Sequence, residues 1–213
     1  MDQEVLSILK RVGSVITDSH FVGTSGRHMG IYVNKDALFP HTAETSRICE
    51  LFAEKNKDLG VDLVVGPALG GIILSQWTAH HLSRITGKEV LSVYTEKVPK
   101  DDGEDQVFRR SYDKIVAGKN VLVLEDTTST GGSVKKVVDT VRGVNGNVAQ
   151  VCVMVNRDPA TINSDTIGAP FSWLAELPAE SWTEEECQLC ASGVPVNTAV
   201  GHGKKFLEKK GMA

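Results

Sequence analysis

The sequence predicts an α/β fold in which helices cover both faces of a parallel sheet. Four continuous apolar runs, at 61–65, 90–94, 121–124 and 148–155, are typical of strands that are buried on both sides. Segments with a helical spacing of apolar residues alternate with these strands, which indicates right-handed crossovers and a doubly wound parallel sheet. The 213-residue chain has no Pro/Gly linker, so we expect one main domain.

The N-terminal residues predict an amphipathic helix rather than a signal peptide. Apolar residues recur at helical spacing from Val5 to Ile16, and charged residues such as Glu4 and Lys10 interrupt them. No apolar run is long enough to span a bilayer, and a net charge of -4 offers no global basic field to nucleic acid or an anionic membrane. We therefore expect a cytoplasmic protein that binds neither nucleic acid nor membrane.

Two longer helices follow the first and third predicted strands. The segment 71–88 predicts a helix that ends at Gly87, and the helix that begins near Ser133 stops at Gly143. The connection 98–118 between the second and third strands is long, charged and poorly periodic, so an active-site lid and a plain surface loop remain open. The segment 159–186 predicts a subsidiary strand or hairpin region.

The thirteen residues VLVLEDTTSTGGS, at 121–133, end a buried strand on two carboxylates. Glu125 and Asp126 stand at the carboxyl end of that strand, where open parallel sheets bind their ligands. Residues 127–133 are small and rich in hydroxyls, and they lead into the start of a helix, whose N–H groups attract anions. Carboxylates beside a phosphate cradle suit a ribose 5-phosphate. The alternative is an ordinary turn between strand and helix.

Other phosphate-binding motifs do not match. The stretch GPALGGI at 66–72 has the glycines of a Walker A loop but carries Ile72 where a Lys is needed. No GxGxxG follows a predicted strand. The thirteen-residue stretch therefore remains the strongest phosphate-binding signal.

The four cysteines fit a reducing compartment. Cys49 and Cys152 lie in apolar surroundings and are expected to be small core residues. Cys187 and Cys190 form one CxxC, which is half of a zinc-ribbon pattern without a second CxxC, and His202 lies twelve residues beyond it. Metal binding and simple packing both remain open for this pair.

The stretch VLVLEDTTSTGGS resembles the phosphoribosyl-pyrophosphate (PRPP) motif of type I phosphoribosyltransferases. From about residue 15 to about residue 160 the chain is most similar to the orotate phosphoribosyltransferase family, in the stretches HFVGTSGRHMGIYVNKDAL, VVGPALGGIILS, EKVPKDDGED and VNRD. The resemblance implies one phosphoribosyltransferase domain over residues 1–213, with a small hood to which residues 1–40 and about 160–213 contribute. It also implies a homodimer, because the mobile loop of this family reaches into the neighbouring subunit's site.

The resemblance implies roles for individual residues. Glu125 and Asp126 would hold the ribose hydroxyls and contact Mg²⁺ through water and substrate, and Lys100 would act with them in catalysis. Ser129 and Arg157 would contact the base. The residues implied in PRPP binding are Ala68, Leu69, Gly70, Gly71, Lys97, Thr127, Thr128, Ser129, Thr130, Gly131, Gly132 and Ser133. On position alone, Arg157 could equally pair with Asp158 at the surface.

Three positions depart from the family's pattern. Glu96 stands where the family's loop has an Arg, Asp102 where it has a His, and Thr24 where a Lys contacts the base. Two cationic positions thus become anionic, and each of these acids would repel a pyrophosphate. The departures bear on the base that is accepted more than on PRPP itself.

These features predict an enzyme that transfers a phosphoribosyl group from PRPP to a nucleobase. The resemblance implies orotate as the base, with orotidine 5′-monophosphate and pyrophosphate as products in pyrimidine biosynthesis. One alternative is a transferase for another purine or pyrimidine base, in salvage. Another is a non-catalytic regulator of the same fold that senses PRPP or a nucleotide.

Overall fold

A six-stranded sheet forms the centre of the protein, which we describe from a computed structural model over residues 1–23, 25–100 and 103–211. The strand order is β10–β9–β8–β5–β6–β7, and every neighbouring pair is parallel except β6 and β7. The strands are β5 (Leu63–Pro67), β6 (Leu91–Lys100), β7 (Gly103–Val107), β8 (Asn120–Thr128), β9 (Asn147–Asn156) and β10 (Phe171–Glu176). The four predicted strands correspond to β5, β6, β8 and β9.

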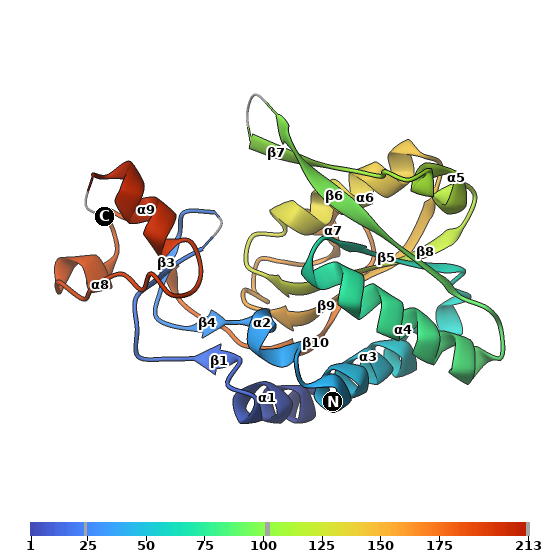
Figure 1. Ribbon diagram of the computed structural model, residues 1–213, viewed down its shortest axis with the longest axis horizontal. Coiled ribbons are helices and arrows are strands. Elements are labelled where there is room, and N and C mark those ends of the chain that lie inside the picture. Colours follow the sequence, from blue (N-terminus) through green and yellow to red (C-terminus); the bar gives the residue numbers. More distant parts are fainter. Residues whose placement is uncertain (24, 101–102, 212–213) are drawn as a thin grey trace.

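Helices cover both faces of this sheet (Figure 1). One face packs against α1 (Asp2–Arg11), α3 (Thr42–Asn56) and α4 (Gly70–Thr86), and the other against α5 (Tyr112–Val116), α6 (Gly132–Gly143) and α7 (Ser164–Ile167). Alternate strand residues enter the two cores, because successive side chains of a strand point to opposite faces. Leu122 and Leu124 belong to the first core, and Val121 and Val123 to the second. The predicted doubly wound α/β fold is confirmed.

Helix boundaries agree with the sequence except at the N-terminus. Helix α4 ends before Gly87, which adopts a left-handed φ of 68°, and α6 ends at Gly143. The N-terminal helix stops at Arg11, so the expectation that it continues to Ile16 is wrong. Gly13, with a φ of 73°, turns the chain, and Val15–Ile16 then form β1 against β4 (Tyr32–Val33).

Over its described residues, the connection between the second and third predicted strands consists of two antiparallel strands, which we call the hairpin, and the short helix α5. Strand β6 continues past the sheet to Lys100, and β7 returns antiparallel to it. The Thr140 hydroxyl on α6 donates to the Gln106 carbonyl at 2.9 Å, which ties β7 to the helix. Mutual backbone pairing organises a segment whose side chains carry no regular pattern. Asp102 lies outside the described residues.

The segment 159–186 divides between two sheets. Strand β10 extends the central sheet parallel to β9, and β11 (Ser181–Trp182) pairs with β3 (His28–Met29). Part of the chain expected in the hood therefore lies in the central sheet, and α1 likewise packs on that sheet. Five of the six residues of β10 are at least half-buried, which accounts for its place at the sheet edge.

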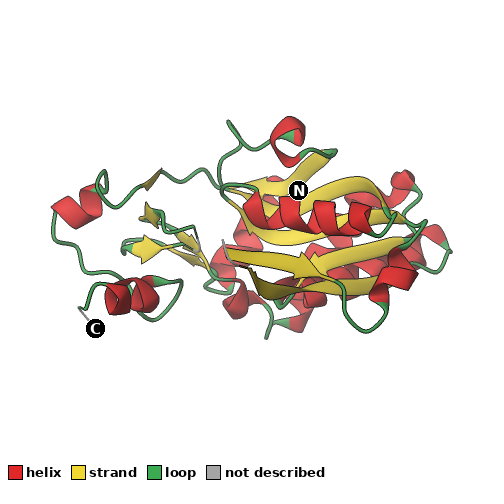
Figure 2. Cartoon of the chain, turned by 90° about the horizontal axis from the view of Figure 1, so that it is seen from above, coloured by secondary structure: helices red, strands yellow, loops and turns green. Residues whose placement is uncertain are grey.

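A small hood lies at one end of the molecule, as Figures 1 and 2 show. We use this name for the antiparallel sheet of β2 (Phe21–Val22), β3 and β11, together with residues 183–211, which include α8 (Gln188–Ala191) and α9 (Gly203–Lys209). Backbone hydrogen bonds join its two halves, from Asn197 N to His20 O at 2.7 Å and from His202 N to Val22 O at 2.9 Å. Strand β4 and α2 (Lys35–Leu38) lead from the hood to the central sheet.

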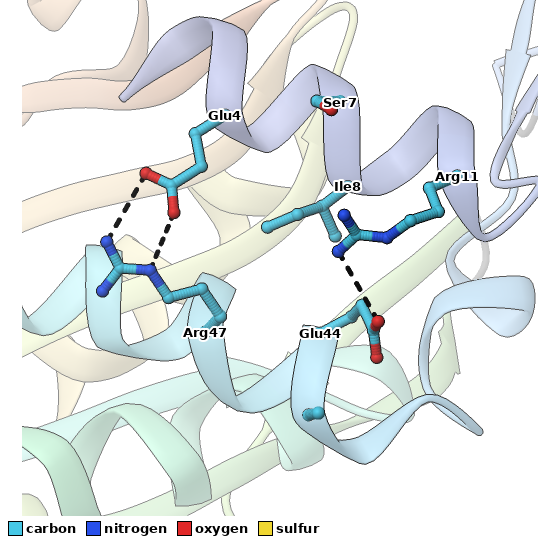
Figure 3. A pocket seen from close by; sticks show the side chains of 7 residues that line it. Glu4, Ser7, Ile8, Arg11, Glu44 and Arg47 are labelled. Carbon is cyan, nitrogen blue, oxygen red and sulfur yellow. Dashed lines mark hydrogen bonds and ion pairs between the residues drawn. The ribbon is translucent and has the colours of Figure 1, made fainter.

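Ion pairs fix α1 on α3 (Figure 3). The Arg47 guanidinium donates to Glu4 at 2.8 Å, and Arg11 lies 3.5 Å from Glu44. The hydrogen bond from Arg47 lowers the pKa of Glu4. A hollow between these helices is lined by charges that already neutralise one another, so it offers no free group for chemistry.

The buried thiols at Cys49 and Cys152 confirm the prediction of core cysteines. Burial raises the pKa of Cys49 to about 12 and that of Cys152 to about 11, so both stay protonated at neutral pH. No helix within the described ranges is long and apolar enough to cross a membrane.

Candidate active site

A cavity of about 390 Å³ opens where the carboxyl ends of the central strands face the hood. Its walls come from the loops after β5, β8 and β9, from the hairpin, and from β3 and β4. The lining residues are Gly23, Ser25, Met29, Tyr32, Val33, Lys35, Pro67, Ala68, Leu69, Gly70, Lys97, Gln106, residues 125–133, Lys136 and Arg157. Most residues that the sequence singled out therefore meet in one place.

Glu125 and Asp126 bring two carboxylates to the floor of this cavity. Glu125 is only 8% exposed, and the Asp126 amide donates to its Oε1 at 3.1 Å. Burial, and then the charge of Asp126, raises the pKa of Glu125 well above its ordinary value. Burial also raises the pKa of Asp126, although Lys35 opposes this shift. The pair therefore favours a ligand that supplies donors or positive charge.

Lys35, at the start of α2, is a site residue that the sequence analysis missed. Its Nζ lies 3.7 Å from Asp126 Oδ2, and the neighbouring carboxylates hold the pKa of Lys35 above its usual value despite burial. A Lys one residue after a helix-capping Asn has no distinctive sequence pattern. Only the path of β4 back to the sheet edge places it beside the acids.

The loop from Thr127 to Ser133 forms an anion cradle at the start of α6. The first N–H groups of a helix have no partner within the helix and carry partial positive charge. Gly131 has a left-handed φ of 75°, which favours glycine, and a Cβ there would lie 2.7 Å from Ile167 Cδ1, so the end of that side chain would have to shift. The Gly131 amide donates to Thr128 Oγ1 at 3.0 Å, which fixes the curvature of the loop.

The loop after β5 brings three of its four predicted residues to the cavity. The Ala68 amide donates to the Thr95 carbonyl at 2.8 Å, so its role as a pyrophosphate donor stays a prediction. Gly71 packs directly against Gly66, because a Cβ added at Gly66 would lie 2.4 Å from the Gly71 carbonyl oxygen. Gly71 does not line the cavity. Ala68, Leu69 and Gly70 do line it. The close Gly66–Gly71 approach turns the start of α4 toward the cavity.

Arg157 enters the cavity from the end of β9. It is 7% exposed, and its guanidinium donates to Met29 Sδ at 2.9 Å and to Ile31 O at 2.8 Å. Among the described residues it forms no ion pair, so the alternative of a surface pair with Asp158 is wrong. Burial lowers the pKa of Arg157. An unneutralised buried guanidinium in a cavity wall favours an anionic ligand group.

The hairpin supplies only one of its two predicted lysines. Lys97 lines the cavity and pairs with Glu104 at 3.2 Å. Lys100 lies outside the cavity and is exposed, 3.8 Å from Asp105. The structure therefore does not bring Lys100 to the acid pair. A residue near the tip of a hairpin reaches the cavity only if the hairpin moves.

Glu96 does not face the cavity. Its carboxylate pairs with Arg110 and lies 3.7 Å from Arg109, and it is absent from the lining residues. The expectation that Glu96 would repel a pyrophosphate is therefore wrong, because two guanidiniums neutralise it. Thr24 and Asp102 lie outside the described residues, so their effect stays a prediction.

Comparison with known proteins identifies the family of this chain. A family model described as phosphoribosyl transferase domain matches residues 34–168, more than half of the chain. An orotate phosphoribosyltransferase of Thermoanaerobacter sp. (strain X514) is 36% identical over 195 residues, which is 91% of this chain and 94% of that protein. The enzyme of the same name from Caldanaerobacter subterraneus subsp. tengcongensis is 35% identical over 91% of this chain and 94% of its own length. The chain belongs to the orotate phosphoribosyltransferase family.

Solved structures agree on the fold. Orotate phosphoribosyltransferase from Mycobacterium tuberculosis superposes with a TM-score of 0.62 at 24% identity, over 82% of this chain and 96% of that one. Its complex with PRPP superposes with a TM-score of 0.59 at 20% identity, over 83% and 91%. The chain is a phosphoribosyltransferase, as the sequence predicted.

Proposed function

We propose that this protein transfers the phosphoribosyl group of PRPP to orotate, which releases pyrophosphate and forms orotidine 5′-monophosphate. The observation that carries the choice of base is the buried, unneutralised Arg157 in the same cavity as the acid pair and the anion cradle. Orotate is a base with a carboxylate, and a guanidinium binds such a group in two parallel hydrogen bonds. The orotate phosphoribosyltransferase relatives support the same choice.

In this proposal the three parts of PRPP lie in order along the floor of the cavity. We assign the ribose hydroxyls to Glu125 and Asp126 and the 5-phosphate to residues 127–133. The pyrophosphate would lie toward Leu69, Gly70 and Lys97. This order places the C1 atom of the ribose between the acid pair and the base, which Arg157 and Ser129 would hold.

Transfer replaces one bond at C1 with another. A ring nitrogen of the base forms a bond to C1 as the bond from C1 to the pyrophosphate oxygen breaks. The electron pair of the broken bond leaves with pyrophosphate, and the proton of the ring nitrogen passes to solvent or to the leaving pyrophosphate. Positive charge develops on the sugar, as in glycoside chemistry, and negative charge develops on the leaving group. Lys97, the amides after β5 and Lys100 of a closed hairpin would meet that negative charge. A closed hairpin would also exclude the water that hydrolyses PRPP.

We propose Mg²⁺ as the cofactor. The lining residues fit a hard cation, because they offer two carboxylates and several hydroxyls and, within the described part of the chain, no imidazole or thiol. Mg²⁺ held through substrate oxygens and water would supply positive charge to the pyrophosphate. Its approach would favour ionisation of Glu125, whose pKa burial has raised.

We also propose that the chain acts as one domain and as a homodimer. The position of Lys100 outside its own cavity supports a dimer in which the hairpin serves a neighbouring site. Light scattering and the rescue of a Lys100→Ala chain by a chain with an inactive cavity would test this arrangement. A cytoplasmic location remains a prediction from the sequence.

A turnover assay with PRPP, Mg²⁺ and a panel of bases tests the proposed reaction. We expect pyrophosphate release with orotate and little with adenine, guanine or uracil, which lack a carboxylate. Arg157→Gln should raise the KM for orotate about 10- to 100-fold, the effect of losing a charged hydrogen bond. Exposed Arg84→Gln, far from the cavity lining, is the matched control. Release with an uncharged base alone would overturn the choice of orotate, and PRPP binding without any release would favour a regulator.

A further inference from the structure

Four metal-ligating side chains converge in the hood, away from the cavity just described. His20 and His28 come from the N-terminal strands, and Cys187 and Cys190 come from the segment around α8. One ligand atom from each residue lies within 4.8 Å of the others. Figure 1 shows why sequence spacing could not reveal this set: the C-terminal segment, in red, folds back beside the blue N-terminal strands. The two missing ligands of the CxxC lie more than 150 residues upstream of it.

The spacing of the four atoms is close to the edges of one coordination tetrahedron. Bonds of about 2.3 Å from zinc to sulfur and about 2.0–2.1 Å to nitrogen require ligand atoms roughly 3.4–3.8 Å apart. His20 Nε2 lies 3.5 Å from Cys187 Sγ and 3.8 Å from Cys190 Sγ, and His28 Nδ1 lies 3.4 Å from Cys190 Sγ. The two ring nitrogens are 2.8 Å apart and would separate by about half an ångström around an ion.

The His20 ring is held in the orientation that a ligand needs. Its Nδ1 lies 2.9 Å from the Val194 carbonyl, which can only accept a hydrogen bond, so Nδ1 carries the proton. That tautomer leaves the Nε2 lone pair pointing at the two sulfurs. Histidine ligands of metals are commonly fixed in this way by a carbonyl behind the ring.

His28 is buried with one nitrogen toward the cluster and one without a partner. Its Nδ1 faces His20 and Cys190, while its Nε2 is buried and has no hydrogen-bond partner in the described part of the chain. Phe206 of α9 packs edge-on against the ring, with centroids 4.9 Å apart. Phe206 and the surrounding burial keep the ring away from solvent. Coordination of a metal through Nδ1 is the polar interaction that remains available to this side chain.

The two cysteines are thiols rather than a disulfide, and their local backbone suits thiolates. Both are free, and the Cys190 amide lies 3.4 Å from Cys187 Sγ and donates to it. Two thiolates neutralise one divalent cation, so a complex with two neutral imidazoles has no net charge to bury. A soft sulfur pair with two imidazoles selects zinc among the abundant divalent ions.

We propose that His20, His28, Cys187 and Cys190 bind one Zn²⁺ ion in a closed, structural, tetrahedral site. Binding replaces the two thiol protons, which leave to solvent, and no electron is transferred. All four positions are taken by protein, so the ion has no open position for a substrate. The site does not rest on the reaction proposed above.

The hood has a physical need for such a crosslink. Its three strands are two residues long each, and its buried residues Phe21, Val22 and Met29 lie outside both hydrophobic cores of the central sheet. Small units without a sufficient core commonly rely on metals or disulfides. Zinc would join the two ends of the chain at the point where they form one sheet.

The site would also support the base end of the cavity. His28 is followed directly by Met29, which lines the cavity and accepts a hydrogen bond from Arg157. An ion that holds His28 therefore holds β3 and, through Met29, the wall beside Arg157. Loss of the ion should loosen this wall without removing a residue that touches substrate.

Metal content of the intact wild-type chain is the direct test. We expect one zinc ion per chain by elemental analysis after purification without chelator. Metal-free protein, prepared under reducing conditions, should take up one Co²⁺ and show the visible bands of tetrahedral cobalt with a thiolate-to-cobalt charge-transfer band. Zinc should displace cobalt stoichiometrically, and its affinity should increase with pH because thiol protons compete.

Variants locate the site. Cys190→Ser and His28→Gln should each weaken zinc binding by more than about 100-fold, the upper end for loss of a mere second-shell partner. Cys49→Ala and His41→Gln remove a thiol and an imidazole elsewhere and should bind zinc as the wild type does. Folding of each variant is checked by circular dichroism, and the cobalt titration of the wild type needs no variant.

Three results on the wild-type chain would overturn the assignment. They are a folded, reduced chain that takes up neither zinc nor cobalt, iron in place of zinc with the spectrum of a cluster, and a Cys187–Cys190 disulfide in freshly purified protein. Equal zinc binding by Cys190→Ser and the wild type would also contradict it. Because metal content is measured without any turnover, an inactive enzyme that binds zinc at these residues would sink only the proposed reaction.

Discussion

The edge of the central sheet and the hood face each other across the cavity, but they are built in different ways. At the sheet edge, backbone hydrogen bonds between parallel strands bring β5, β8 and β9 to one line, and each strand delivers its next residues to the cavity. The hood has short strands, little apolar core and ligands drawn from both ends of the chain. Backbone pairing between the strands positions the sheet edge, whereas contacts between side chains must position the hood.

This difference assigns separate tasks to the two sides. In the proposed reaction, the sheet edge would hold the groups that must be placed accurately for bond exchange, namely the acid pair and the anion cradle. The hood side carries Met29 and Gly23, and through Met29 it supports Arg157. Changes at the edge or in the hairpin should therefore reduce turnover, and changes in the hood should weaken binding of the base.

The largest effect on turnover should come from the hairpin, which is part of neither the sheet edge nor the hood. Lys100→Ala should lower kcat about 10²- to 10³-fold, since it removes a cation that would meet the developing charge of the leaving group. PRPP affinity should fall far less, because Lys100 lies outside the cavity before closure. Steady-state kinetics and a PRPP binding titration measure the two effects.

Lys114→Ala, an exposed change on α5, is the control for Lys100. Equal losses of kcat and PRPP affinity in Lys100→Ala would contradict the role, because they would mean that Lys100 binds substrate uniformly. An increase in the KM for orotate alone would mean that the hairpin, like the hood, acts on binding of the base.

A smaller effect should show how strictly the sheet edge depends on backbone conformation. Gly131→Ala forces a left-handed φ on alanine and places its Cβ against Ile167, so it should destabilise the protein by about 1–3 kcal/mol. At this chain length the melting temperature should fall by roughly 2–4 °C per kcal/mol. Gly143→Ala at the end of the same helix meets no atom within 4 Å and should be close to neutral. Calorimetry of both variants compares them, and a neutral Gly131→Ala would show that the cradle is not fixed by this glycine.

The same contrast explains what the sequence could predict. Glu125, Asp126 and the cradle are contiguous, so thirteen residues of sequence were enough to predict that they lie together. Lys35 and the four-residue cluster of the hood could not, because their proximity comes from the path of the chain rather than from spacing. Glu96 appeared repulsive for a similar reason: Arg109 and Arg110, which neutralise it, reach it only through the pairing of β6 with β7.

The position of Lys100 shows a second limit. A motif can identify the residue, but the resting position of a hairpin depends on contacts such as Thr140 with Gln106, which carry no sequence signal. The structure therefore brings the predicted residues to one cavity where the sheet holds the backbone, as at Glu125 and Asp126, and leaves Lys100 outside it where the backbone extends beyond the sheet.

The smallest expected effect is a gain in stability at the acid pair. Burial raises the pKa of Glu125, so its ionisation costs folded-state stability as pH rises above the ordinary carboxyl range. Glu125→Gln removes that cost and should raise the melting temperature without ligand by about 2–4 °C, roughly 1 kcal/mol, at about pH 8. The advantage should shrink as pH falls back into the ordinary carboxyl range, where the carboxyl is protonated in the folded and the unfolded chain alike.

Thermal unfolding of Glu125→Gln and of exposed Glu89→Gln, with and without PRPP and Mg²⁺, completes the comparison. The first variant should lose most of the ligand-induced stabilisation that Glu89→Gln retains, because the amide cannot supply the anionic oxygens that the diol and cation use. A destabilised Glu125→Gln would mean that the carboxylate is already neutralised in the free protein. The charges at the sheet edge would then neutralise one another, as they do in the α1–α3 contact. The cavity would offer no unneutralised carboxylate for the substrate to bind.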